Sequence, residues 1–182
     1  MTKQLKTGMA VVLASAALVA GPLTPSDAWA GKKSTVKARI DDAKFKANRK
    51  AGAAGAGGAY DSITGILNIV AASAKLSGRG LGTTVDLKVL SLTTGVPDLA
   101  LATFPLTVPV ELTTFSRIVN QGGIPQGEQI WDGEGVTLTI TSYKDGRLKA
   151  TFEGTIPADF GTTTDALVED GKLNVLLNAP VL

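Results

Sequence analysis

From residue 35 onward, apolar and polar side chains alternate in short runs. Val36–Ile40 and Ala43–Ala47 are the first two runs, and basic residues occupy the polar positions of both. A period of two is typical of a half-buried strand, so the pattern predicts two strands whose basic side chains face solvent. Asp41 and Asp42 lie between the runs and are interpreted as turn residues.

The same period recurs along the rest of the chain. The predicted strands cover residues 63–72, 83–92, 99–112, 113–119, 136–141, 147–153 and 173–177. Asp145-Gly146 separates two alternating runs, which is the strongest short-range signal of a hairpin; a second pair, Asp170-Gly171, precedes the last run. Pro105 and Pro109 lack the backbone N–H that a central strand needs, so the 99–112 strand is expected at an edge or with a bulge.

These runs predict an all-β fold, an antiparallel β-sandwich or flattened barrel of about eight or nine strands. Residues 31–182 are expected to form a single domain, since a chain of about 150 residues is long enough to bury one core. Within it, Ala51–Ala59 reads AGAAGAGGA and has no side chain larger than a methyl group, so it is predicted to be a flexible loop. A helix there is disfavoured because each glycine costs about 1 kcal/mol relative to alanine.

The first thirty residues have the order of a secretory signal peptide. Lys3 and Lys6 precede the apolar run Met9–Ala20, which is 12 residues long, and Ala28-Trp29-Ala30 supplies small residues around a cleavage point. A transmembrane anchor would need about 20 apolar residues. We therefore expect a cleavable signal helix at 1–30, cleavage near Ala30, and a protein secreted to the periplasm or the extracellular medium.

Two residue types are missing, and their absence narrows the chemistry. The chain has no histidine and no cysteine. Ser-His-Asp and Cys-His catalysis and most zinc sites are therefore excluded, as is a lipid anchor on cysteine. There is also no phosphate-binding or dinucleotide-binding glycine motif. We expect no catalytic residue, no cofactor and no metal site.

Charge is unevenly distributed. Residues 31–50 carry eight basic and two acidic side chains, whereas residues 51–182 carry eight basic and thirteen acidic ones. The basic stretch is interpreted either as a patch for an anionic polymer or, with more support, as the solvent face of a strand pair whose lysines discourage edge pairing. A nucleic-acid partner is not expected, because Phe45 is the sole aromatic residue in the stretch and falls on its apolar face.

One constellation has the residue types for ligand binding. Trp131 lies in a glycine-rich segment that is predicted to be a loop. Its indole has the flat apolar face that would stack on a sugar ring. The candidate ligand-binding residues are Trp131, Glu128, Asp132, Glu134 and Tyr143. The carboxylates have the chemistry for glycoside hydrolysis or for calcium, although the spacing of an EF-hand is missing. The alternative is a solvated loop with Trp131 folded back over the end of the sandwich.

The C-terminal order resembles a group of uncharacterised exported bacterial proteins. The segments VTLTITSY, KDGR, LKATFEGTI and EDGKLNV follow one another as their "ITIT", "GTF-G" and "DG-F-V" hairpins do, and ARIDDAKFKA with ITGILNIVAA is similar to their start. Leu173 stands where an aromatic residue is common in that group. The resemblance implies an antiparallel β-sandwich and carries over no catalytic residue.

Three functional hypotheses remain from the sequence. The first is a non-enzymatic secreted binding or surface-interaction protein, whose partner is a glycan or another envelope component. The second is a carboxylate-dependent glycan hydrolase that uses the segment around Trp131. The third is a carrier of small apolar ligands in a barrel interior. The mature chain is expected to have no membrane span, and its oligomeric state stays open.

Overall fold

The computed structural model describes residues 34–48, 55–78, 83–122 and 124–178, and these residues form strands, turns and loops without a helix. The predicted signal helix at 1–30 lies outside the described residues. The described residues contain eleven strands, more than the eight or nine expected. They are β1 (Thr35–Ile40), β2 (Ala43–Asn48), β3 (Gly55–Asp61), β4 (Ile66–Ser77), β5 (Thr84–Gly95), β6 (Leu106–Pro109), β7 (Leu112–Gln121), β8 (Ile124–Gly133), β9 (Val136–Lys144), β10 (Arg147–Ile156) and β11 (Ala166–Asn178).

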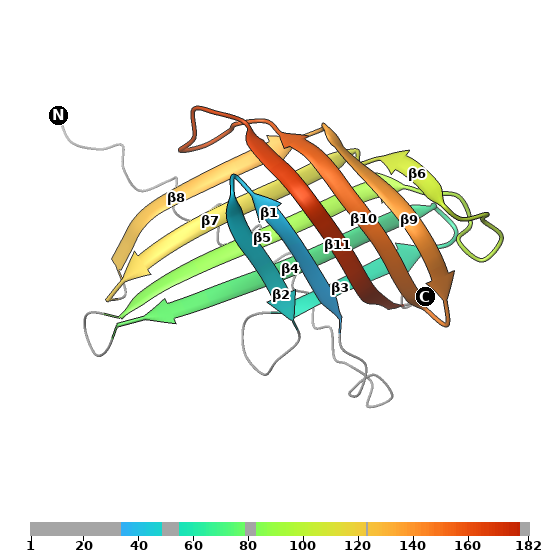
Figure 1. The fold of residues 1–182 in the computed structure, drawn as a ribbon, viewed down its shortest axis with the longest axis horizontal. Coiled ribbons are helices and arrows are strands. Elements are labelled where there is room, and N and C mark those ends of the chain that lie inside the picture. The colour runs from blue at the N-terminus through green and yellow to red at the C-terminus, as the bar shows by residue number, and fades with distance from the viewer. Residues whose placement is uncertain (1–33, 49–54, 79–82, 123, 179–182) are drawn as a thin grey trace. The chain divides into compact units, whose positions relative to one another are not determined.

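The strands belong to one hydrogen-bonded sheet that is arranged in two layers (Figure 1). Its order is β6-β9-β10-β11-β3-β4-β5-β7-β8, and β1 and β2 extend it from β11. We call β2, β1, β11, β10, β9 and β6 the front layer, and β3, β4, β5, β7 and β8 the rear layer. All pairs are antiparallel except β11 with β3, which run parallel and connect the layers. The sheet is therefore mixed, and it does not close into a barrel.

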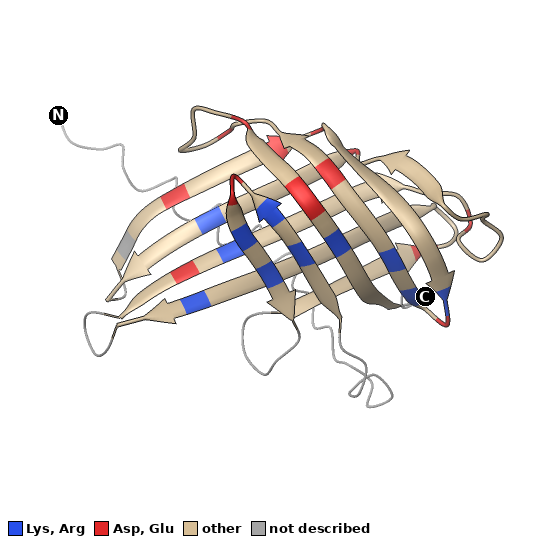
Figure 2. Ribbon diagram, in the orientation of Figure 1, with Lys and Arg blue, Asp and Glu red and all other residues tan. Residues whose placement is uncertain are grey.

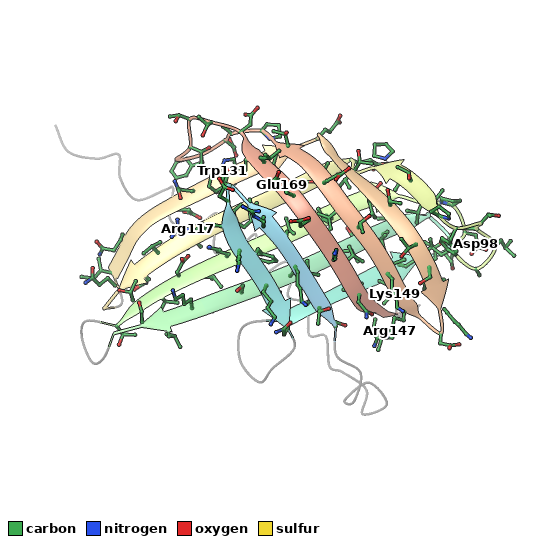
Figure 3. The ribbon with its side chains drawn as sticks, viewed as in Figure 1. Asp98, Arg117, Trp131, Arg147, Lys149 and Glu169 are labelled. Atoms are coloured by element: carbon green, nitrogen blue, oxygen red, sulfur yellow. The ribbon has the colours of Figure 1, made fainter. Side chains whose placement is uncertain are left out.

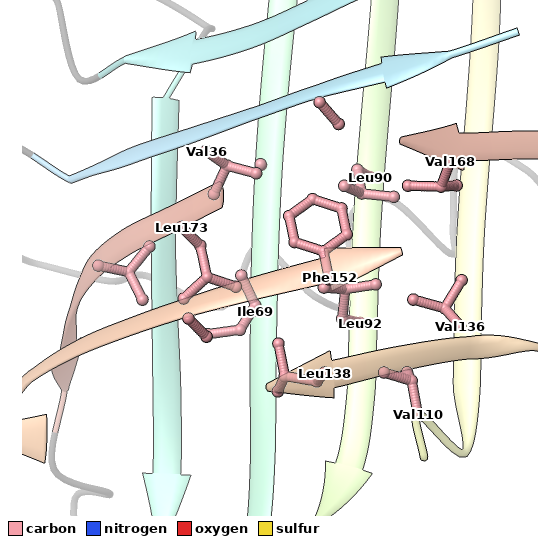
Figure 4. Close-up of a cluster of buried hydrophobic side chains, with 14 of the residues drawn as sticks. Val36, Ile69, Leu90, Leu92, Val110, Val136, Leu138, Phe152, Val168 and Leu173 are labelled. Atoms are coloured by element: carbon pink, nitrogen blue, oxygen red, sulfur yellow. The ribbon is translucent and has the colours of Figure 1, made fainter. Parts of the chain in front are cut away.

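The core lies between the two layers (Figure 4). Phe152 and Leu138 of the front layer face Ile69, Leu90 and Leu92 of the rear layer, and all five are at most 2% exposed. Phe152 and Leu138 sit at the apolar positions of alternating runs, whereas Leu90 and Leu92 have the parity of Asp86 and Lys88 in β5, where Val85, Leu87 and Val89 are only half-buried. Burying such a side chain contributes about 1.5–3 kcal/mol relative to leaving it in water. The alternation seen in the sequence thus accounts for the front half of the core, while in β5 the buried face changes to the other parity.

Part of the predicted Gly/Ala-rich loop is a strand. Residues 55–59 belong to β3, while 51–54 lie outside the described residues. A Cβ on Gly58 would lie 2.6 Å from Cδ1 of Ile69 and 2.7 Å from Cδ2 of Leu177. The small residues therefore have a packing role, because glycine here lets side chains of β4 and β11 close over the strand.

The predicted 99–112 strand is shorter than expected. Residues 96–105 form turns and loops, and only Leu106–Pro109 pairs, as β6 at the edge of the sheet against β9. The expected edge position is confirmed. Leu99, which is 1% exposed, anchors the preceding loop in the core. The apolar alternation of the sequence includes these loop residues because some of them, such as Leu99, are also buried in the core.

The Asp-Gly pairs have two different roles. Asp145 (φ 51°) and Gly146 (φ 72°) form the tight turn between β9 and β10, which confirms the predicted hairpin. Asp170 has a φ of 52° but lies within β11, where the pairing with β10 shifts register. Gly171 fits there because a Cβ would collide with the backbone of Phe152. This second pair forms a bulge inside a strand.

Candidate functional site

The segment around Trp131 is strand β8, where a loop was expected. Trp131 is 7% exposed, its ring lies 5.4 Å from that of Phe115, and its Nε1 donates to the carbonyl oxygen of Thr164 at 3.0 Å. The indole therefore closes one end of the core and presents no free face to a sugar (Figure 3).

The three carboxylates near Trp131 do not all meet at one point. Glu128 and Asp132 lie four residues apart on the same face of β8, about 13 Å along the strand. Asp132 accepts a hydrogen bond from Thr114 Oγ1 at 2.6 Å, and Glu134 is exposed in the turn after β8. Glycoside hydrolysis needs two carboxyl groups roughly 5–9.5 Å apart. The described residues also contain no cluster of three acidic groups suited to a metal ion.

Tyr143 lies away from these residues. β9 begins three positions after the last residue of β8, and Tyr143 is seven residues further along β9, about 23 Å from its start. Its ring packs edge-on against Tyr60 with centroids 6.4 Å apart. Of the five residues selected from the sequence, Tyr143 thus lies apart from the other four, which are on β8 or in the turn after it.

A different group of side chains meets on the outer surface of the front layer. In the strand registers, Lys37 of β1 lies opposite Lys46 of β2 on one side and opposite Lys172 of β11 on the other. We call Lys46, Lys37 and Lys172 the lysine row. Neighbouring strands are about 4.8 Å apart. All three side chains are exposed, so three positive charges stand side by side.

Further basic residues surround the lysine row (Figure 2). Arg39 and Lys44 lie next along β1 and β2, and Lys149 lies on β10, all exposed. We call these three residues and the lysine row together the basic face. Of its members, Arg39 makes an ion pair, with Asp42 at 2.8 Å, and Glu169 lies opposite Arg39 in the β1–β11 register.

The five lysines of the basic face make no ion pair with any residue that the structure describes. Like charges directly opposite one another on a sheet are destabilising. Glu169 of β11 lies toward the other end of the front layer from Lys149 (Figure 3). The charge of the five lysines therefore has no ion-pair partner among the described residues and is open to a ligand.

The sequence pattern predicts the part of this site that lies on β1 and β2. The alternation of 36–47 placed the lysines of β1 and β2 on a solvent face, as observed. Lys172 was missed because it is more than 120 residues away and joins the row only through the pairing of β1 with β11. The EDGKLNV segment shows no sign of that pairing in its own composition.

A second charged group lies on the rear layer, on its core-facing side. Arg117 of β7 binds both carboxylate oxygens of Asp86 of β5 at 3.1 Å. Lys88 lies opposite Arg117, and Lys75 lies opposite Asp86. Here the acidic residue sits among the basic ones, so this group neutralises part of its own charge.

Comparison of the chain with protein-family models, with curated proteins and with solved structures gave no match in any of the three. The part of the chain that the structure describes has no helix with the length and apolar character to cross a bilayer.

Proposed function

We propose that this protein is a non-enzymatic, exported binding protein whose basic face holds an anionic partner. The observation that carries the proposal is the lysine row, in which Lys37 stands between two like charges without a carboxylate partner among the described residues. An arrangement that destabilises the fold is expected where a ligand supplies the missing charge. The basic stretch is thus interpreted as more than the solvent face of a strand pair.

The export part of the proposal rests on residues 1–30, whose charged start, apolar run and Ala-Trp-Ala end have the order of a Sec signal. The resemblance to exported bacterial β-sandwich proteins points the same way. In that setting the available anionic partners include acidic glycans and other envelope polymers.

The two alternatives have less support. The hydrolase was to bind its sugar on Trp131, which is only 7% exposed, and the strand geometry of β8 keeps Glu128 and Asp132 about 13 Å apart. The carrier would need an interior cavity, and the space between the layers is occupied by the core side chains (Figure 4). The basic face needs neither, since it lies on the outer surface.

The test compares two triple variants with the same change in net charge. The first replaces the lysine row with threonine (K37T, K46T and K172T), and the matched control replaces three lysines elsewhere (K75T, K88T and K144T). Threonine is favourable in strands, so both variants are expected to fold. Circular dichroism and thermal unfolding check this before binding is measured.

Binding is measured by isothermal titration calorimetry with polygalacturonate, dextran sulfate and neutral dextran at low and high salt. The proposal expects wild type and control to bind the two anionic polymers, the lysine-row variant to lose most of that binding, and none of them to bind neutral dextran. Binding should weaken with salt, because ions screen exposed charges. Equal loss in both variants would show that net charge alone matters and would overturn the proposal, as would no binding by wild type.

A further inference from the structure

The lysine row continues across the rest of the front layer as a line of hydroxyl groups. Thr151 of β10 lies opposite Lys172, Thr139 of β9 lies opposite Thr151, and Thr107 of β6 lies opposite Thr139. We call Thr151, Thr139 and Thr107 the threonine row. Together the two rows occupy one register position on six adjacent strands and span about 24 Å.

The hydroxyls of the threonine row are accessible. Thr107 and Thr151 are exposed and Thr139 is half-buried. Oγ1 of Thr107 and Oγ1 of Thr139 are 3.1 Å apart and share one hydrogen bond. Because a hydroxyl has one donor and two acceptor positions, this bond leaves acceptor capacity on both residues and a free donor on one.

Six aligned positions therefore present three cations followed by three hydroxyls. A polyphosphate chain would match the cations alone and find no charged group on the threonine half. A polymer that carries both anionic groups and hydroxyl groups along its length matches the whole line. The strand spacing of about 4.8 Å is also comparable to the length of one sugar unit in an extended polysaccharide.

We infer that the partner of the basic face is an acidic polysaccharide that lies across the strands, with its anionic groups on the lysine row and its sugar hydroxyls on the threonine row. This inference rests on the proposed function and adds the ligand class and its direction on the sheet. The ligand runs perpendicular to the strands, from β2 toward β6.

The test removes the hydroxyls while keeping shape and charge. Valine has nearly the same shape as threonine and is also favourable in strands, so the threonine-row variant is T107V, T139V and T151V. The matched control, T84V, T103V and T163V, adds the same apolar surface outside the front layer. Both are titrated with polygalacturonate, with inorganic polyphosphate and with vesicles rich in phosphatidylglycerol.

The inference expects the threonine-row variant to bind polygalacturonate about tenfold or more weakly than the control does, because a net hydrogen bond contributes a factor of several to affinity. Polyphosphate binding should change little. Affinity for oligogalacturonates should rise with length and level off at about five or six sugars, the length of the combined row.

Three outcomes would overturn the inference. If the threonine-row variant binds polygalacturonate as the control does, the hydroxyls take no part, although the proposed function stands as long as the lysine-row variant fails to bind. If wild type prefers the vesicles or polyphosphate over polygalacturonate, the ligand class is wrong. If the lysine-row variant binds normally, the proposed function fails and this inference with it.

Discussion

Replacing Lys37 with threonine should make the protein more stable. Lys37 lies opposite Lys46 and Lys172, and each cross-strand charge pair contributes roughly 0.2–1 kcal/mol, unfavourable here because the charges are alike. Removing the central charge removes both pairs at once. We therefore expect K37T to raise the free energy of unfolding by about 1 kcal/mol at low ionic strength.

Salt dependence identifies the cause of this gain. The Debye length falls from about 10 Å at 0.1 M salt to about 3 Å at 1 M, so exposed lysines then cease to repel one another. Urea unfolding followed by circular dichroism at 20 mM and at 1 M NaCl measures the difference. The gain should shrink to a few tenths of a kcal/mol in 1 M NaCl, leaving the preference of threonine for strands.

Lys75 is the matched control for this prediction, because it lies opposite Asp86 and so has an unlike neighbour. K75T should leave stability unchanged or lower it by a few tenths of a kcal/mol at low salt. A K37T variant that is less stable than wild type at low salt, or a gain equal at both salt concentrations, would refute the reasoning about the lysine row.

Three further predictions concern the sandwich itself. Gly58→Ala should destabilise by about 1–3 kcal/mol in urea unfolding because the added Cβ meets packed neighbours, whereas Gly57→Ala, where the space is open, should be neutral or slightly stabilising. Trp131→Phe should lower stability by about 1 kcal/mol through the lost hydrogen bond to Thr164, with polygalacturonate binding unchanged; weakened binding would return Trp131 to the ligand site. The pKa of Asp61 is lowered from 3.8, first by the backbone N–H of Ile63, which donates a hydrogen bond to its Oδ1. The stabilisation from Asp61 is therefore present above about pH 4 and is lost as the pH falls through the lowered pKa. Asp61→Asn should flatten the profile of unfolding free energy below about pH 4, and an unchanged acid limb would contradict this.

The local pattern of the sequence predicted most of the strands. Alternation located β1, β2, β5, β9 and β10, and the Asp145-Gly146 pair fixed one hairpin because its turn needs positive φ. The same dipeptide at Asp170 led to a bulge, since the chain there had a strand to continue along β10. An Asp-Gly pair favours a backbone with positive φ at both places. Whether the chain then turns back or continues past a bulge depends on the strand with which it pairs.

Other features depend on contacts between distant segments. The composition of Ala51–Ala59 by itself indicates a loop. In the structure, Gly58 lies between β4 and β11, where no larger residue fits. Trp131 with its neighbouring carboxylates looked like a ligand site because sequence does not show which face of β8 is covered. The lysine row shows this most clearly, because Lys172 joins Lys37 only through the β1–β11 register.

The most direct test of the central claim is to map where an acidic oligosaccharide contacts the protein. In two-dimensional NMR of isotope-labelled protein titrated with hexagalacturonate, the shifted amides should lie on β1, β2 and the 172–174 part of β11, with smaller shifts on β10, β9 and β6. Shifts confined to residues 128–134, or no saturable shifts at all, would contradict the account.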